Sequence, residues 1–360
     1  MTKAASPEPV HVIAGGAPDG LTTLERTLAE LVARSFPSGF SLAVVDAGGT
    51  LMSAYGGEAC RIGTARPITT CTSYDLASLT KVVCSVTLAL VYAGRGMLSV
   101  DDPVVDWLPG FSRSDTTLLH LLTHTSGLVA HRPFFERLRG RAAIVEAVFE
   151  EAAGSAPTGD VLYSDLNFML LGWVLEACGG AGLEELFATE VAVPLGMNRT
   201  GFRPAQGEET AATELDGDQR LVPGLVWGEV HDGNAYALGG VAGHAGLFAP
   251  VADLADFVRH LLAPDGRVLN RQALQAMSAR RAGRSPDVRG LGWRLDPEDW
   301  GDWPDDTLWH TGFTGTSLLF SQSRGLGVIL LTNAIHPYRR LEDQTAVRAT
   351  LHRAVSEAFR

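Results

Sequence analysis

The sequence is nearly without lysine. Only Lys3 and Lys81 carry an amine side chain, and the other 27 of the 29 basic residues are arginines. A guanidinium stays protonated up to about pH 12, whereas a buried lysine can lose its proton and act as a base. Lys81 is the one lysine far from the N-terminus, so it is a candidate for chemistry that arginine cannot perform.

Basic clusters, paired cysteines and long apolar runs are also scarce. The net charge is −12, with 41 acidic residues against 29 basic ones, so we expect no nucleic-acid partner. The longest apolar run, Val82 to Tyr92, is about half of the ~18–20 residues of a membrane span, so we expect a buried helix there and no membrane span. The cysteines lack the CxxC spacing of a zinc or redox site, which predicts free thiols at Cys60, Cys71, Cys84 and Cys178.

The N-terminal twenty residues lack the apolar core of about 7–15 residues that a secretory signal requires. We therefore expect a cytoplasmic protein, although a chain from which a leader had been removed would look the same. The composition, 46% hydrophobic and 19% charged, is that of a folded globular protein. A chain of 360 residues is long enough for one large domain or two interleaved ones.

Strand signals gather at both ends of the chain and helical periodicity in its middle. Strands are predicted for Gly39–Val45, Thr50–Tyr55, Thr307–Thr311, Thr316–Ser321 and Leu326–Thr332. Helices are predicted for Leu21–Phe36, Ser78–Tyr92, Thr117–Thr123, Ala142–Ala153, Asn167–Cys178, Leu183–Val191, Val251–Leu262 and Arg339–Phe359. This order indicates an α+β fold, in which an antiparallel sheet from both termini is flanked by the terminal helices and receives an inserted, mainly helical domain. We place the sheet domain at residues 1–74 and 290–360 and the inserted domain at 75–289.

The segment Ser78-Leu79-Thr80-Lys81 is the first candidate for chemistry. In a helix that begins near Ser78, Lys81 lies on the same face one turn later, where its amine can take the serine proton. Free N–H groups and the positive end of the helix dipole lie beside the hydroxyl. With 20 serines in 360 positions, this spacing arises by chance about once in 18 sequences, so the motif needs support from its context.

Two later motifs supply that context, namely Tyr163-Ser164-Asp165 and His310-Thr311-Gly312. With Ser-x-x-Lys they resemble the set Ser-x-x-Lys, Tyr-x-Asn and Lys-Thr-Gly of the serine β-lactamase and penicillin-recognising superfamily. The resemblance is to its class C-like branch of β-lactamases, D-alanyl-D-alanine peptidases, esterases and transacylases, and it extends from about Ser38 to Asn333. Further similar segments are Leu118–Leu128, Pro194–Met197 and Gly243–Phe248.

The resemblance implies a role for each motif residue at the seam of the two domains. Ser78 is the expected nucleophile that forms an acyl-enzyme, and Lys81 and Tyr163 share the proton transfers, with the general base open between them. Phe313 matches a strand position whose backbone N–H completes an oxyanion hole with that of Ser78. We expect substrate contacts from Asp165, His310, Thr311, Gly312, His131 and His244, although a surface position for His131 is an equally good interpretation.

Two departures from the family pattern bear on the substrate. Asp165 stands where β-lactamases carry asparagine, and an ionised carboxylate there favours the ammonium form of Lys81 and repels an anionic substrate. His310 stands where they carry lysine, and a neutral imidazole binds a carboxylate poorly. Both changes favour a neutral acyl donor over a penicillin or a cephalosporin. An alternative is that Asp165 and His310 are ordinary variants within a peptidase branch.

The sequence thus predicts a serine hydrolase or acyltransferase that needs no cofactor. The expected partners are a small-molecule ester or amide as acyl donor, with water, an amine or an alcohol as acceptor. A β-lactamase or D-alanyl-D-alanine carboxypeptidase is the alternative enzyme, and a non-catalytic binding protein of the same fold is a second alternative. His120 and His124 have the spacing of a zinc pair, but no third ligand is evident, so we predict no metal site.

Overall fold

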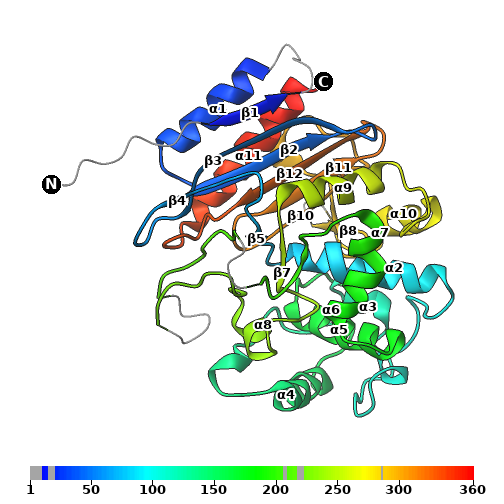
Figure 1. Cartoon of the computed structure of the whole chain (residues 1–360). Coiled ribbons are helices and arrows are strands. Elements are labelled where there is room, and N and C mark those ends of the chain that lie inside the picture. The colour runs from blue at the N-terminus through cyan, green and yellow to red at the C-terminus, as the bar shows by residue number, and fades with distance from the viewer. Residues whose placement is uncertain (1–9, 15–20, 206–208, 217–222, 285–286) are drawn as a thin grey trace.

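The computed structural model describes residues 10–14, 21–205, 209–216, 223–284 and 287–360. An antiparallel sheet of nine strands, built from the two ends of the chain, crosses the upper half of Figure 1 between the terminal helices and the rest of the protein. The strand order is β1 (His11–Ala14), β3 (Thr50–Cys60), β2 (Gly39–Val45), β12 (Leu326–Thr332), β11 (Ser317–Ser321), β10 (Leu308–Thr311), β9 (Arg294–Leu295) and β8 (Val288–Arg289), with β4 (Arg66–Pro67) beside β3. The predicted α+β fold with an antiparallel sheet is confirmed.

Both faces of the sheet are buried, because alternate side chains of its central strands enter two different cores. In β2, Leu42 and Val44 pack with the terminal helices α1 (Leu21–Ala33) and α11 (Leu341–Ala358). Ala43 and Val45 point to the opposite face and pack with α9 (Val251–Leu262) and the rest of the helical part. The uninterrupted apolar sequence of β2 follows from this burial on both sides.

The helical part lies below the sheet in Figure 1 and centres on α5 (Asp165–Gly179). Its residues from Leu166 to Leu175 are all buried, so apolar side chains surround this helix on every side. The other helical elements are η1 (Lys81–Val86), α2 (Thr87–Gly94), η2 (Val104–Asp106), α3 (Leu118–Thr123), η3 (Phe134–Glu136), α4 (Arg141–Ala153), α6 (Leu183–Phe187), η4 (Ala188–Ala192), α7 (Val193–Leu195), α8 (Gly233–Ala237), α10 (Arg271–Ser278) and η5 (Glu298–Trp300).

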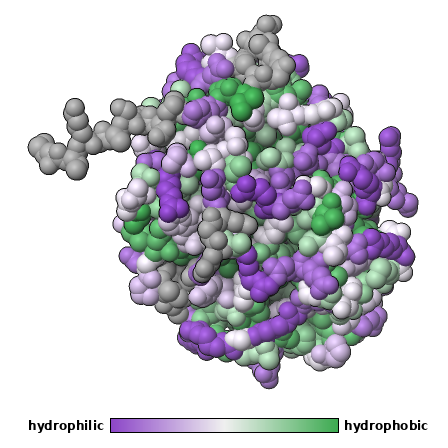
Figure 2. All heavy atoms as spheres, viewed as in Figure 1, coloured by the Kyte–Doolittle hydropathy of each residue, from purple (hydrophilic) through white to green (hydrophobic). Residues whose placement is uncertain are grey.

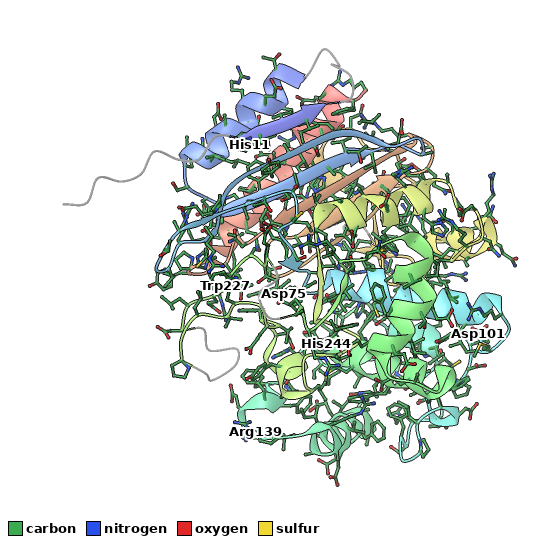
Figure 3. The ribbon with its side chains drawn as sticks, in the orientation of Figure 1. His11, Asp75, Asp101, Arg139, Trp227 and His244 are labelled. Atoms are coloured by element: carbon green, nitrogen blue, oxygen red, sulfur yellow. The ribbon has the colours of Figure 1, made fainter. Side chains whose placement is uncertain are left out.

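A small second sheet joins the two parts of the molecule. Its strands are β5 (Tyr74–Asp75), β7 (Leu247–Ala249) and β6 (Gly201–Phe202), and β5 leads directly into the segment that carries Ser78. In Figure 3, Asp75 lies at the boundary between the large sheet and the helical part, with His244 just below it. The candidate motifs therefore meet near this boundary.

The described surface is that of a charged globular protein. On the face shown in Figure 2, hydrophilic side chains are spread among smaller hydrophobic areas. Among the described residues no single helix is long and apolar enough to cross a bilayer, and the one helix pair with sufficient length, Asp165–Gly179 with Leu183–Leu195, is bent by 75°.

Candidate active site

Ser78 follows a short strand and a strained residue. Ala77, directly before it, has a left-handed backbone with φ of 47°, a conformation that costs a non-glycine residue about 1–3 kcal/mol. The buried carboxylate of Asp75 stabilises this turn by accepting the Ala77 N–H at 2.8 Å. Thr314 donates its hydroxyl to the Asp75 carbonyl at 2.7 Å and so ties the turn to the loop after β10. The helix begins at Leu79, one residue later than the sequence indicated.

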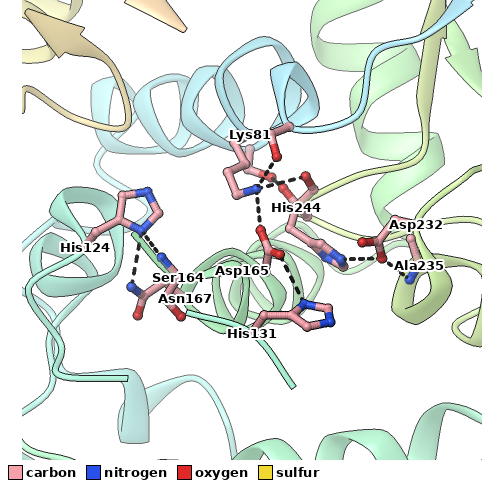
Figure 4. A network of polar contacts seen from close by, with 12 residues as sticks. Lys81, His124, His131, Ser164, Asp165, Asn167, Asp232, Ala235 and His244 are labelled. Carbon is pink, nitrogen blue, oxygen red and sulfur yellow. Dashed lines mark hydrogen bonds and ion pairs between the residues drawn. The ribbon is translucent and has the colours of Figure 1, made fainter. Parts of the chain in front are cut away.

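Lys81 lies beneath Ser78 and is fully buried. It opens η1, a π-helical turn of a kind often found at functional sites. Its Nζ donates to Ser78 Oγ at 2.9 Å, to Asp165 Oδ1 at 2.8 Å and to the His244 carbonyl at 3.3 Å (Figure 4). The one lysine in the interior of the sequence is thus in contact with the candidate nucleophile.

Lys81 and Asp165 form a buried ion pair. Burial lowers the pKa of the Lys81 amine, but the Asp165 carboxylate and the Tyr163 phenol raise it above its ordinary value. Burial raises the pKa of the Asp165 carboxyl, but Lys81 and His131 together bring it well below the usual range. The amine is therefore held as an ammonium ion, which makes Lys81 a poor proton acceptor in the resting protein.

The loop between α3 and η3 positions the second motif. His124 Nδ1 accepts the Ser164 N–H at 3.0 Å, and the Ala130 carbonyl accepts the Asp165 N–H at 2.9 Å. The His124 ring lies 4.6 Å from the Tyr163 ring, centroid to centroid. Burial and the nearby cations lower the pKa of His124 well below its ordinary value, so this ring packs against the tyrosine as a neutral group.

These segments enclose a cavity of about 260 Å³. It brings together six of the predicted site residues, Ser78, Tyr163, Asp165, His131, His244 and Phe313, and its remaining lining residues are Ala77, His231, Asp232 and Ala245. His131 is about one-third exposed and its Nδ1 lies 3.5 Å from Asp165 Oδ2. Among the described residues, no group of three His, Cys, Asp or Glu side chains could hold a metal ion.

The third motif lies behind this cavity and does not line it. His310 is 3% exposed, and burial and neighbouring cations lower its pKa well below the ordinary value. Its Nδ1–H donates to the Thr311 carbonyl at 2.9 Å, and Thr311 itself is half-buried. A Cβ on Gly312 would lie 2.1 Å from Thr316 Oγ1, so glycine is required where this chain passes the Ser78 segment. None of these three residues lines the cavity, and the structure shows them shaping a turn. Their substrate contacts stay a prediction.

That turn presents Phe313, which lies beyond the end of β10 and not on the strand as expected. Gln344 Nε2 donates to the Phe313 carbonyl at 2.8 Å, and the Arg348 guanidinium donates to the Gly312 carbonyl, so α11 holds the turn. In the described part of the chain, neither the Ser78 N–H nor the Phe313 N–H donates to a protein acceptor. Two free backbone donors beside a nucleophile can bind the oxyanion of a tetrahedral intermediate.

Two histidine–carboxylate pairs at the cavity were not predicted from the sequence. His231 and Asp232 are neighbours in the chain, yet each binds another residue. His231 Nε2 lies 2.9 Å from Glu214 Oε2, and His244 Nε2 lies 2.9 Å from Asp232 Oδ1. Since the partners come from separate loops, only the tertiary structure brings them together.

Comparison with known proteins agrees with this arrangement. The family model named Beta-lactamase matches residues 24–352. An Escherichia coli K12 protein named "Putative D-alanyl-D-alanine carboxypeptidase" is 28% identical over 312 residues, which cover 74% of this chain and 70% of that protein. Among solved structures, EstCE1, described as a hydrolase with promiscuous acyltransferase activity, has a TM-score of 0.76 at 20% identity and covers 94% of this chain and 98% of its own. A class C β-lactamase has a TM-score of 0.72 at 19% identity, with coverage of 92% and 94%. The chain belongs to the beta-lactamase family and is an enzyme of its serine hydrolase and acyltransferase type.

Proposed function

We propose that the protein transfers acyl groups through a covalent Ser78 ester, using small-molecule esters or amides that carry no carboxylate near the scissile bond. Water is the default acceptor, and an alcohol or an amine is the alternative. The observation that carries the proposal is the charge of the cavity wall. Asp165 and Asp232 line it, whereas none of its described lining residues is a lysine or an arginine.

Acylation follows from the contacts of Ser78. Lys81 donates to Ser78 Oγ, which leaves the serine hydrogen free for transfer to another base. Because Asp165 holds Lys81 as an ammonium ion, we favour Tyr163 as the group that takes this proton. Tyr163 must be a phenolate to do so and becomes a neutral phenol when it takes the proton. The Lys81 ammonium lies 4.9 Å from the Tyr163 ring centroid, where its charge offsets that of the phenolate. The backbone N–H groups of Ser78 and Phe313 bind the developing oxyanion.

The electrostatics of the cavity select against anionic substrates. A peptide that ends in D-alanine and a penicillin both bear a carboxylate close to the bond that is cleaved. A cation at the cavity wall favours binding of such a group, but Lys81 is fully buried and already paired with Asp165. The neutral, buried His310 cannot replace that cation. A neutral acyl donor avoids repulsion from the two carboxylates.

A matched pair of substrates tests this proposal. An N-acetylated D-alanyl-D-alanine peptide is compared as free acid and as methyl ester of its terminal carboxylate, with release of D-alanine or its ester measured by mass spectrometry. We expect kcat/KM to be at least tenfold higher for the neutral form, and a p-nitrophenyl ester to react faster than either. A preference for the free acid would instead support the carboxypeptidase alternative, which the E. coli relative's name favours.

The acceptor is tested separately. An activated ester is incubated with a panel of amines and alcohols, and the ratio of transfer product to free acid is measured. Transfer product that grows with acceptor concentration supports an acyltransferase, the activity that the description of EstCE1 reports beside hydrolysis. Free acid alone at high acceptor concentration indicates a hydrolase. Rapid turnover of a chromogenic cephalosporin would overturn the preference for neutral donors.

A further inference from the structure

Two histidines on the cavity wall are each oriented by a carboxylate. His244 Nε2 lies 2.9 Å from Asp232 Oδ1, and His231 Nε2 lies 2.9 Å from Glu214 Oε2. A carboxylate beside one ring nitrogen fixes the N–H on that nitrogen and leaves the other nitrogen as a proton acceptor. The cavity that holds Ser78 therefore also holds two oriented imidazoles.

His244 has the features expected of a buried general base in the active site. Its side chain is 1% exposed, and its Nδ1 has no hydrogen-bond partner among the described residues. The carboxylate that orients it is itself fixed, because Asp232 Oδ1 also accepts the Ala235 N–H at 2.8 Å as the N-cap of α8. The residue lines the cavity, and its ring keeps one buried acceptor nitrogen that no described residue uses.

The backbone holds His244 along the turn that follows Ser78. Ser85 Oγ donates to the Gly243 carbonyl at 2.7 Å, and Lys81 Nζ donates to the His244 carbonyl at 3.3 Å (Figure 4). A Cβ on Gly243 would lie 2.1 Å from the Phe168 carbonyl, so a glycine is required for this close approach to α5. The main chain of His244 is thus held against η1, the helical turn that follows Ser78. None of these contacts uses the His244 side chain.

Other groups around the cavity are less suited to accept a proton. Asp165 holds Lys81 as an ammonium ion, and its hydrogen bond also raises the pKa of His131. Glu214, the partner of His231, also forms an ion pair with Arg339, in which Oε1 of Glu214 lies 2.6 Å from Nε of Arg339. Elsewhere in the described chain, no lysine or arginine forms an ion pair with Asp232.

We propose that His244, oriented by Asp232, is the general base for the second half of the reaction; this rests on the proposed acyl-enzyme function. His244 Nδ1 takes a proton from the incoming water, alcohol or amine while the acceptor's lone pair forms a bond to the acyl carbon. The carbonyl electron pair moves onto the oxygen held by the N–H groups of Ser78 and Phe313. When it returns, the bond to Ser78 Oγ breaks, and that oxygen receives a proton from the Lys81 ammonium. The proton on His244 then passes to Lys81, directly or through solvent, and restores its ammonium form. The acid, ester or amide product leaves a free serine.

Substitutions that spare the backbone test this assignment. In His244→Gln the carbonyl that Lys81 contacts is retained, and in Asp232→Asn the cap of α8 is retained, because asparagine caps helices as well as aspartate. His231→Gln is the matched control, since it alters the other oriented imidazole of the same cavity. Each variant is mixed rapidly with p-nitrophenyl acetate, the release of p-nitrophenol is followed, and the acyl-enzyme is measured by intact mass.

For His244→Gln we expect a burst whose rate stays within about threefold of the wild-type rate and a steady-state rate lower by about 10²- to 10⁴-fold, the usual contribution of a positioned base. The protein should then accumulate with an acetyl group on Ser78. Asp232→Asn should act in the same direction with a smaller effect, and His231→Gln should keep the wild-type ratio of burst rate to steady-state rate. Hydroxylamine, a strong nucleophile, should restore much of the lost rate.

Three outcomes would contradict the assignment. The first is unchanged turnover of folded His244→Gln, and the second is a burst slowed as much as turnover, which would place His244 in acylation. The third is slow turnover with accumulation of the acyl-enzyme in His231→Gln and not in His244→Gln. If His244→Gln fails to fold, Asp232→Asn supplies the same comparison. A wild-type protein that gains no acyl group on Ser78 would overturn the proposed function itself, which separates that failure from a failure of His244 alone.

Discussion

The Lys81–Asp165 ion pair makes a prediction that runs against the usual effect of an active-site substitution. Asp165→Asn keeps the shape of the side chain and removes its charge, which lies 2.8 Å from the Lys81 amine. Burial lowers the pKa of Lys81, and in the variant the Asp165 charge, which is the main cause that raises this pKa, is gone. We therefore expect more of the variant to hold a neutral Lys81 at pH 7. This amine can then take the Ser78 proton in place of Tyr163, and acylation of Ser78 should become faster.

The size of the gain follows from two opposing effects. A carboxylate this close typically biases its partner's protonation by about 10- to 1,000-fold. A less basic amine is also a weaker proton acceptor, and Brønsted behaviour removes roughly half of each decade. The net expectation is an acylation rate about 3- to 30-fold higher at pH 7. The assay is the second-order rate of labelling by a fluorophosphonate between pH 5 and about pH 10, with circular dichroism to confirm folding. A slower rate at every pH would show that the carboxylate has a direct part in proton transfer, and the reasoning would be refuted.

The same variant predicts how stability depends on pH. The folded-state pKa of Asp165 is depressed, so its stabilising contribution is present above its ordinary pKa of about 3.9 and is lost as the pH falls through the depressed value. Lys81 has a raised pKa, so its contribution is present below about pH 10.4 and is lost as the pH rises further. Wild type should therefore melt at a higher temperature than the variant throughout the range between these limits, and the difference in Tm should shrink in stronger acid. A difference that persists unchanged in acid would contradict the ion pair's contribution.

Other substitutions have simpler expected outcomes. Ser78→Ala should abolish acylation. Lys81→Arg should retain less than about a tenth of wild-type activity, because the pair with Asp165 could survive but the compact amine that donates to Ser78 Oγ would be lost. Steady-state ester hydrolysis measures both variants, and an active arginine variant would remove the amine from the mechanism. Gly243→Ala should lower Tm and activity, since overpacking typically costs about 1–3 kcal/mol, whereas Gly94→Ala, with open space around the new Cβ, should leave both unchanged. Equal Tm values for the two alanine variants would contradict the close packing against α5.

Regular spacing explains which parts of this site the sequence could predict. A serine and a lysine three residues apart share one face of a helical turn, so their 2.9 Å contact follows from local geometry. The β-prone residues of β2 and β12 likewise predict strands from local sequence, and burial on both faces of the sheet explains why these runs are almost wholly apolar. The helix after the second motif was predicted to begin at Asn167, and α5 begins two residues earlier, at Asp165.

The remaining features depend on contacts between distant segments. Asp232 binds His244, twelve residues away, and not its neighbour His231. The short helix α8 and the turn after it lie between Asp232 and His244 and bring the chain back to Asp232. His310 was expected in the cavity, but the strand that carries it turns its ring into the interior behind Tyr163, 6.0 Å between ring centroids. No periodicity in the sequence specifies such loop geometry, so neither result could be predicted from it.

The central claim is that Ser78 becomes covalently acylated by a neutral ester. The most direct measurement is intact-mass spectrometry of wild type and Ser78→Ala after brief exposure to p-nitrophenyl acetate, followed by peptide mapping. The account predicts one acetyl group per wild-type chain on Ser78 and none on the variant. An acetyl group on another residue, or equal ester hydrolysis by the two proteins without a covalent intermediate, would contradict it.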